Sequence, residues 1–178
     1  MTAHQGTADG SELRSDAAGR LERMYATHIA AAVRLAFLIT GDGEQARDIA
    51  QDAFVRVAAR FAELRDPEAF PAYLRTAVVN RSRDHLRKLR THRRFLARHP
   101  RREAVSSQPD VEGKDALWKV LQTLPVRQRT ALVLRYYEDL SERQIAHELG
   151  TTESAVKSLL TRGLGQLRGE LRGETWSG

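Results

Sequence analysis

The chain has no cysteine among its 178 residues. Disulfide bridges and thiolate metal sites are therefore excluded, which fits a protein of the cytoplasm. Aromatic residues make up only 6% of the chain, and no apolar run is long enough to span a membrane. The longest run, residues 35–39, stops just before Gly41, and residues 1–20 lack the apolar segment of a signal peptide. We therefore expect a cytoplasmic location without membrane insertion.

The sequence also lacks the short motifs that indicate common enzymatic chemistry. It contains no glycine–lysine loop for phosphates, no His-Glu-x-x-His zinc motif and no nucleophile elbow. Its six histidines are scattered without the spacing of metal ligands: His4, His28, His85, His92, His99 and His147. We expect a protein that is not an enzyme and that holds neither a cofactor nor a metal ion.

Positive charge and helical periodicity are what the sequence does have. Lys and Arg outnumber Asp and Glu by 29 to 23, so nucleic acid or an anionic membrane surface is a plausible partner. Apolar residues recur at three- and four-residue spacing through most of the chain, whereas the alternation typical of β-strands does not stand out. The predicted fold class is all-α.

Proline, glycine and serine divide the chain into two helical parts. The periodicity dissolves between residues 93 and 113, where the breakers are Pro100, Ser106, Ser107, Pro109 and Gly113. We expect two small helical domains, 19–92 and 114–172, a flexible linker at 93–113, a disordered tail at 1–18 and a short tail at 173–178. Because the linker offers few apolar anchors, the two domains are expected to move independently.

Residues 141–168 have the pattern of a helix-turn-helix. Ser141 and Gln144 occupy capping-box positions, small Ala146 permits a close helix crossing, and Gly150 permits the positive φ of the turn. Val156 would pack back under the first helix. The outer side of the second helix, which could read a major groove, then carries Ser154, Lys157, Ser158, Thr161 and Arg162. The alternative is a plain helical hairpin with a solvated face.

A basic run lies near the end of the first domain. Residues 81–102 hold ten Lys or Arg and one acid, Asp84, a composition that attracts a phosphate backbone or simply forms a solvated helix face. A polar stripe on the same helix favours DNA, because asparagine can read base edges while arginines hold phosphates. Aromatic residues just upstream could stack on unpaired bases, or could be core residues. The candidate set is Phe70, Tyr73, Thr76, Asn80, Arg83, Arg87 and Arg90.

The helix predicted at 43–61 has one apolar face and one acidic-polar face. The polar face carries Asp48, Gln51 and Asp52. Such a face can dock on a basic surface of a partner protein, and the alternative is again a solvated face.

The order of these three features resembles the extracytoplasmic-function (ECF) sigma factors of the sigma-70 family. Residues 48–57 are similar to the region 2 helix that docks on the clamp helices of the largest RNA polymerase subunit. Residues 69–80 with Arg87 resemble the part of region 2 that opens and reads the promoter −10 element. Residues 124–129, 134–138, 140–146 and 149–150 resemble region 4, which reads the −35 element. Residues 35–41 are similar to the actinobacterial SigE-like branch.

The resemblance implies a division of functional residues between the two domains. It implies that core polymerase binds Asp48, Gln51, Asp52 and Val55, that the candidate set of the basic helix contacts the −10 element, and that the outer residues of the second helix of the helix-turn-helix contact the −35 element. The implied partners are core RNA polymerase, promoter DNA and an anti-sigma factor, often membrane-bound. In this chain Leu159 and Gly163 stand where many family members have the arginine and alanine of the recognition helix, so the −35 sequence cannot be transferred.

Two other functions are compatible with parts of the sequence. A stand-alone helix-turn-helix regulator that binds operator DNA without polymerase would explain residues 141–168. A general nucleic-acid-binding protein would explain the basic run. Neither accounts for both domains and their order.

Overall fold

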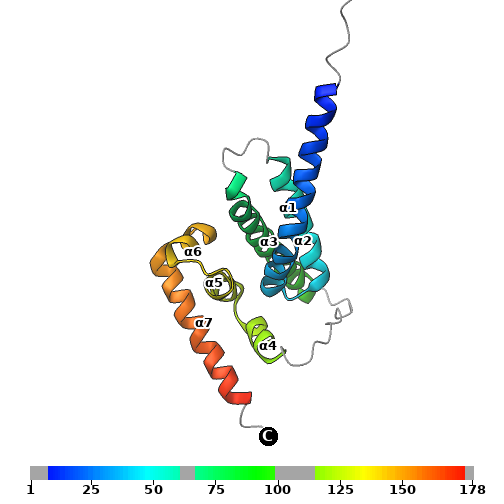
Figure 1. The fold of residues 1–178 in the computed structure, drawn as a ribbon. Coiled ribbons are helices and arrows are strands. Elements are labelled where there is room, and N and C mark those ends of the chain that lie inside the picture. Colours follow the sequence, from blue (N-terminus) through cyan, green and yellow to red (C-terminus); the bar gives the residue numbers. More distant parts are fainter. Residues whose placement is uncertain (1–7, 61–66, 99–114, 175–178) are drawn as a thin grey trace, which may run out of the picture.

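The computed structural model describes residues 8–60, 67–98 and 115–174, which form seven α-helices, a 3-10 turn and no strand (Figure 1). The N-terminal domain consists of α1 (Ala8–Thr40), α2 (Gly43–Ala59), the turn Pro67–Ala69 and α3 (Phe70–Arg98). The C-terminal domain consists of α4 (Asp115–Thr123), α5 (Val126–Tyr136), α6 (Glu142–Leu149) and α7 (Glu153–Glu174). The all-α prediction is confirmed.

Several helix ends are fixed by local signals in the sequence. Gly41 ends α1 at a φ of 81°, and its N–H donates to the carbonyl of Phe37 at 2.8 Å. Asp42 then caps α2 by accepting two backbone N–H bonds. At α6 the capping box of Ser141 and Gln144 is present, and Gly150 ends the helix with a φ of 59°. The turn of the helix-turn-helix is therefore built as the sequence predicts.

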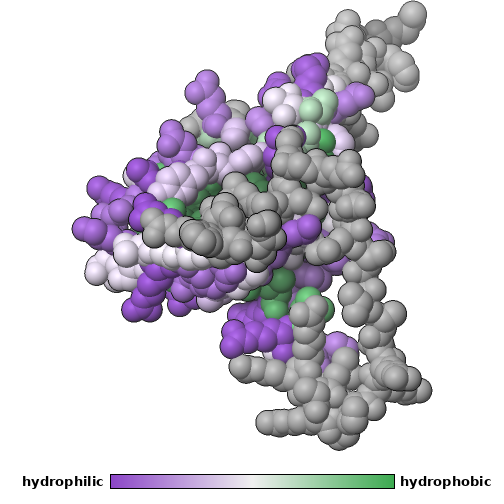
Figure 2. Space-filling model, turned by 90° about the horizontal axis from the view of Figure 1, so that it is seen from below, coloured by the Kyte–Doolittle hydropathy of each residue, from purple (hydrophilic) through white to green (hydrophobic). Residues whose placement is uncertain are grey.

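The core of the N-terminal domain forms where α1, α2 and α3 pack together. Phe54 and Phe70 meet with ring centroids 5.5 Å apart, and Tyr25 packs edge-on against Phe54 at 5.0 Å. Ile39 and Val78 are fully buried in the same core. On the face of the molecule shown in Figure 2, hydrophilic residues cover most of the described surface. Among the described helices, none combines the length and the apolarity that a membrane crossing requires.

Three helices are longer than the sequence predicted, and one of them, α7, runs to Glu174, past residue 168 and into the expected tail. Helix α1 begins at Ala8, inside the segment 1–18 that was expected to be a disordered tail. This segment contains alanine, glutamate, leucine and arginine, all good helix formers, so it can extend a helix that is already nucleated downstream. Helix α3 continues to Arg98, past the point where apolar periodicity ends. The rest of the expected linker, residues 99–113, lies outside the described residues.

The two domains are packed against each other, which corrects the expectation that they move independently. Helix α5 lies between the N-terminal domain and α7 (Figure 1), and buried residues of both domains form one continuous apolar cluster. Phe37 of α1 stacks on Trp118 of α4 with centroids 5.5 Å apart. Gln122 donates to the carbonyl of Leu38 at 3.4 Å. No local sequence pattern indicates these contacts, because their partners are more than eighty residues apart.

Two glycines of α7, Gly163 and Gly165, lie in different environments. Alanine substitutions at these two positions can therefore be compared as a matched pair in measurements of stability. A Cβ on Gly163 would lie 2.8 Å from Leu132 Cδ1, and Leu132 is buried, whereas nothing described lies within 4 Å of a Cβ on Gly165. We expect Gly165→Ala to raise the free energy of unfolding by about 1 kcal/mol through helix propensity. We expect Gly163→Ala to lower it by about 1 kcal/mol, because overpacking costs about 1–3 kcal/mol.

Thermal unfolding followed by circular dichroism measures both variants. If Gly163→Ala stabilised the protein as much as Gly165→Ala, the close approach of α5 and α7 at this point would be disproved.

Candidate DNA and protein interfaces

The acidic-polar face of α2 is exposed, as the sequence predicts. Asp48, Gln51, Asp52 and Val55 all lie on the solvent side, while Ile49, Ala50, Ala53, Phe54 and Val57 on the other side are buried. The side chain of Val55 is 59% exposed, which leaves an aliphatic group in water beside carboxylates. An apolar centre with a charged rim is the usual composition of a protein-binding surface.

The two carboxylates of this face differ in what they contact. Asp52 forms an ion pair with Arg81 of α3 and a second one, at 3.4 Å, with Arg56 of its own helix. Asp52 therefore also ties α2 to α3. Among the described residues no cation pairs with Asp48, so its charge is available to a partner.

A groove of about 1010 Å³ separates the polar face of α2 from α3. Asp48 and Asp52 line one side, and Tyr73 and Asn80 line the other. Tyr73 is 52% exposed and Asn80 is exposed, so both can meet an unpaired base. The predicted protein-binding face and part of the predicted DNA-binding stripe thus share one groove.

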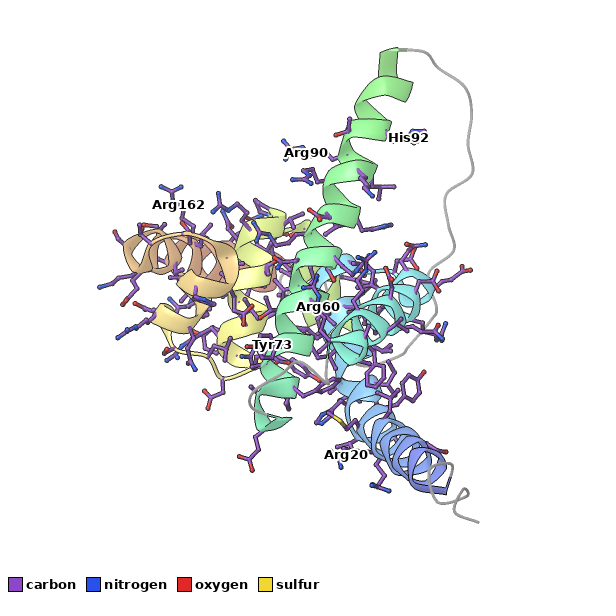
Figure 3. All side chains as sticks on the ribbon, turned by 90° about the horizontal axis from the view of Figure 1, so that it is seen from above. Arg20, Arg60, Tyr73, Arg90, His92 and Arg162 are labelled. Carbon is purple, nitrogen blue, oxygen red and sulfur yellow. The ribbon has the colours of Figure 1, made fainter. Side chains whose placement is uncertain are left out.

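The basic end of α3 projects beyond the rest of the molecule. Arg87 and Arg90 are exposed there, and Figure 3 shows Arg90 well away from Tyr73 along the helix. Arg87 forms an ion pair with Asp84 at 3.0 Å. Both arginines remain accessible to a phosphate backbone.

Phe70, which was predicted to contact the −10 element, is a core residue instead, and this corrects the prediction. Its side chain is fully buried, next to Phe54 and with His28 at a centroid distance of 5.7 Å. A base cannot stack on a ring that the core already encloses on all sides.

Two further members of the stripe are half-buried, and one of them, Thr76, faces the C-terminal domain. Thr76 donates its hydroxyl proton towards Glu148 Oε1 at 2.9 Å and lies 3.0 Å from the carbonyl oxygen of Ala72. Arg83 is half-buried, and its pKa is lowered by burial and then by the like charge of Arg127 on α5. In this conformation the stripe is interrupted at both places.

The outer face of α7 has the composition predicted for a recognition helix. Ser154, Lys157, Ser158, Thr161 and Arg162 are all exposed. Val156 is fully buried and Leu160 is 7% exposed, so the inner face holds the helix on the domain. Figure 3 shows Arg162 pointing away from the other helices. An exposed helix face of this kind can lie in a major groove.

A cluster of charged residues between the domains was missed by the sequence reasoning. Arg75 of α3 lies 3.4 Å from Glu148 Oε1 and 3.8 Å from Glu138 Oε2. Burial raises the pKa of Glu138, Arg75 opposes this rise, and Glu148 adds to it. Glu148 Oε2 is buried without a hydrogen-bond partner among the described residues. The available signal was a glutamate between Ile145 and Leu149, on the apolar side of α6.

A second buried charge lies close to the contact between α1 and α4. Arg129 is 5% exposed, and burial lowers its pKa to about 10. Its guanidinium donates to the side-chain oxygen of Gln122, the residue that also bonds to the carbonyl of Leu38. The arginine therefore orients a residue of the domain interface. Within the described part of the chain, no group of three or more possible metal ligands is present.

Comparison with known proteins gives the same arrangement of two regions. Residues 24–92 match "Sigma-70 region 2", and residues 114–167 match "Sigma-70, region 4". The RNA polymerase sigma-E factor of Streptomyces coelicolor is 31% identical over 153 residues, covering 84% of this chain and 85% of that protein.

Two further similarities extend the comparison. The probable RNA polymerase sigma factor RfaY of Xanthomonas campestris is 33% identical over 147 residues, and the match spans 77% of this chain but only 36% of RfaY. Among solved structures, the sigma factor RpoE of Bartonella quintana, in complex with the anti-sigma factor NepR, gives a TM-score of 0.67. The identity is 20%, over 85% of this chain and 96% of that one, so this likeness concerns the fold.

Proposed function

The chain belongs to the ECF group of the sigma-70 family of RNA polymerase sigma factors, and we propose that its two domains divide promoter recognition between them. In this proposal the N-terminal domain binds core polymerase and the −10 element, and the C-terminal domain binds the −35 element. The observation that carries it is the recognition face of α7, whose five predicted side chains are all exposed beside a buried inner face.

We assign core polymerase binding to Asp48, Gln51, Asp52 and Val55 on α2. Val55 has an exposed side chain, and Asp48 has no cation partner among the described residues. Both observations support this assignment, because binding would bury the first side chain and neutralise the second. The ion pair between Asp52 and Arg81 gives Asp52 an additional structural role.

We assign −10 recognition to the exposed part of the stripe on α3. Tyr73 offers a stacking surface, Asn80 offers hydrogen bonds to a base edge, and Arg87 and Arg90 offer phosphate contacts. Thr76 joins this set only when the C-terminal domain moves away, and the half-buried Arg83 is partly available. Phe70 supports the surface from within the core.

We assign −35 recognition to the outer face of α7. Lys157 and Arg162 can reach guanine edges or phosphates, and Ser154, Ser158 and Thr161 can make shorter contacts. Because Leu159 and Gly163 differ from the common family pattern, the −35 sequence must be measured for this protein.

Further properties follow from the proposed function. A protein that acts with core polymerase works in the cytoplasm, has no enzymatic role of its own, and is open to control by an anti-sigma factor. The complex of the similar RpoE with NepR supports the last inference. A stand-alone operator-binding regulator fits less well, because it leaves the α2 face and the match to sigma-70 region 2 without a purpose.

The first prediction concerns core polymerase binding. Asp48→Arg should weaken binding at least tenfold, or by about 1.4 kcal/mol, because it places a like charge against a basic surface. Asp52 is left intact, since its ion pair with Arg81 would mix binding with stability. Glu22→Arg, at an exposed position of α1, is the control with the same change in charge. Affinity measured by fluorescence anisotropy should fall only in the first variant, and equal affinities would remove Asp48 from the interface.

The second prediction separates base reading from phosphate binding on α3. Asn80→Ala should relax the preference at one or two −10 positions by about 1–3 kcal/mol. Arg87→Ala should weaken open-complex formation at all promoters alike and lower its salt dependence. Transcription from a library of randomised −10 elements measures both. An unchanged preference profile for Asn80→Ala would show that another residue reads the element.

The third prediction distinguishes a sigma factor from a stand-alone regulator. DNA footprinting of the wild type on a target promoter should show protection only when core polymerase is present. Lys157→Ala should lose the upstream part of that protection while it still binds core, because α7 lies in the other domain from the α2 face. Sequence-specific protection by the wild type without core, unchanged when core is added, would contradict the proposed function.

A further inference from the structure

The charged cluster between the domains joins residues that lie beside the two DNA-reading elements. Glu148 is the seventh residue of α6, the first helix of the helix-turn-helix, and it contacts both Arg75 and Thr76 of α3. Glu138, in the turn before α6, contacts Arg75 from the same side. Two carboxylates of the −35-reading domain therefore hold two adjacent residues of the −10-reading helix.

This contact cannot persist on a promoter. The −10 and −35 elements are about 25 base pairs apart, which is about 80 Å along B-form DNA. Glu148 and Thr76 lie 2.9 Å apart in the packed structure. The two domains must separate before both elements can be read, and the carboxylates must then leave Arg75 and Thr76.

We propose that Glu148, with Glu138, forms an autoinhibitory latch that holds the free protein closed and releases Arg75 and Thr76 when core polymerase binds. The proposal rests on the proposed function for its consequences, while the latch itself is a property of the free chain. In the closed state the carboxylate oxygens occupy the place that phosphate oxygens of DNA would take on the arginine and the threonine.

Two features of the contact between the domains favour its opening. In the closed state Glu148 Oε2 has no hydrogen-bond partner among the described residues, and the like charge of Arg127 acts on Arg83 across the domain boundary. Opening hydrates the carboxylates and relieves this repulsion. The balance between attraction within the cluster and repulsion beside it leaves a closed state that a partner protein can displace.

The chain carries its own reporter of closure. Trp118 stacks on Phe37 at the contact between α1 and α4, with an angle of 3° between the ring planes. This contact involves other helices than the latch, which joins α3 to α6 and to the turn before it. A change in Trp118 fluorescence caused by a substitution at Glu148 therefore reports separation of the domains.

The experiment uses the full chain with Trp176→Phe, which leaves Trp118 as the only tryptophan. Adding Glu148→Ala should shift Trp118 emission to longer wavelength and increase acrylamide quenching at least twofold. Its rate of promoter opening together with core polymerase should increase several-fold, because Arg75 and Thr76 no longer have to be released from Glu148. Glu142→Ala, a carboxylate removed from the start of the same helix, is the control and should change neither quantity.

Each outcome decides the proposal. A folded Glu148→Ala variant with unchanged emission and quenching would overturn the latch. If that variant loses helicity, Glu148→Leu replaces it, because leucine keeps a similar volume and a high helix propensity but accepts no hydrogen bond, and the same two results apply. Should no form of the chain bind core polymerase, the proposed function fails, yet the fluorescence of Trp118 still decides whether Glu148 holds the domains together.

Discussion

The packing of the two domains depends on the interaction of the Glu148 carboxylate with residues of the N-terminal domain. Both described partners, Arg75 and Thr76, belong to the other domain. Removing one member of a buried ion pair costs about 3–5 kcal/mol, whereas separating both into water costs much less. Together with the unsatisfied Oε2, which costs about 1–3 kcal/mol, this makes the interface specific in its geometry without making it strong. The stacking of Trp118 on Phe37 supplies the apolar part.

This interface explains why the functional surfaces are unequally available. The α2 face and the outer face of α7 are exposed in the closed state, so core polymerase and the −35 element can be approached directly. Thr76 of the −10 stripe is bonded to Glu148 of the C-terminal domain, and Arg83 is half-buried. Contact with core polymerase through α2 therefore comes before complete reading of the −10 element.

Features that depend on neighbours in the sequence could be predicted, and features that depend on distant partners could not. The capping box at Ser141, the turn at Gly150 and the exposed faces of α2 and α7 follow from local spacing. The pairing of Arg75 with Glu148 joins residues 73 positions apart and has no local signal. Phe70 was misplaced because an aromatic residue at the start of a helix has the same pattern in a core as on a surface. Gly163 looked only like a weak point in α7, whereas its lack of a side chain lets Leu132 approach.

The central claim, that a closed free protein opens to read a promoter, is tested most directly by a distance between the domains. Because the chain has no cysteine, spin labels can be placed at Ala26→Cys in α1 and Arg143→Cys in α6, both exposed positions. Pulsed electron paramagnetic resonance on the free protein should give one narrow distribution of distances between the two spin labels. In the complex with core polymerase and promoter DNA, the distribution should move to a distance longer by tens of ångströms, towards the separation of about 80 Å between the two elements. The same distribution in both states, or a broad distribution of long distances in the free protein, would contradict the account.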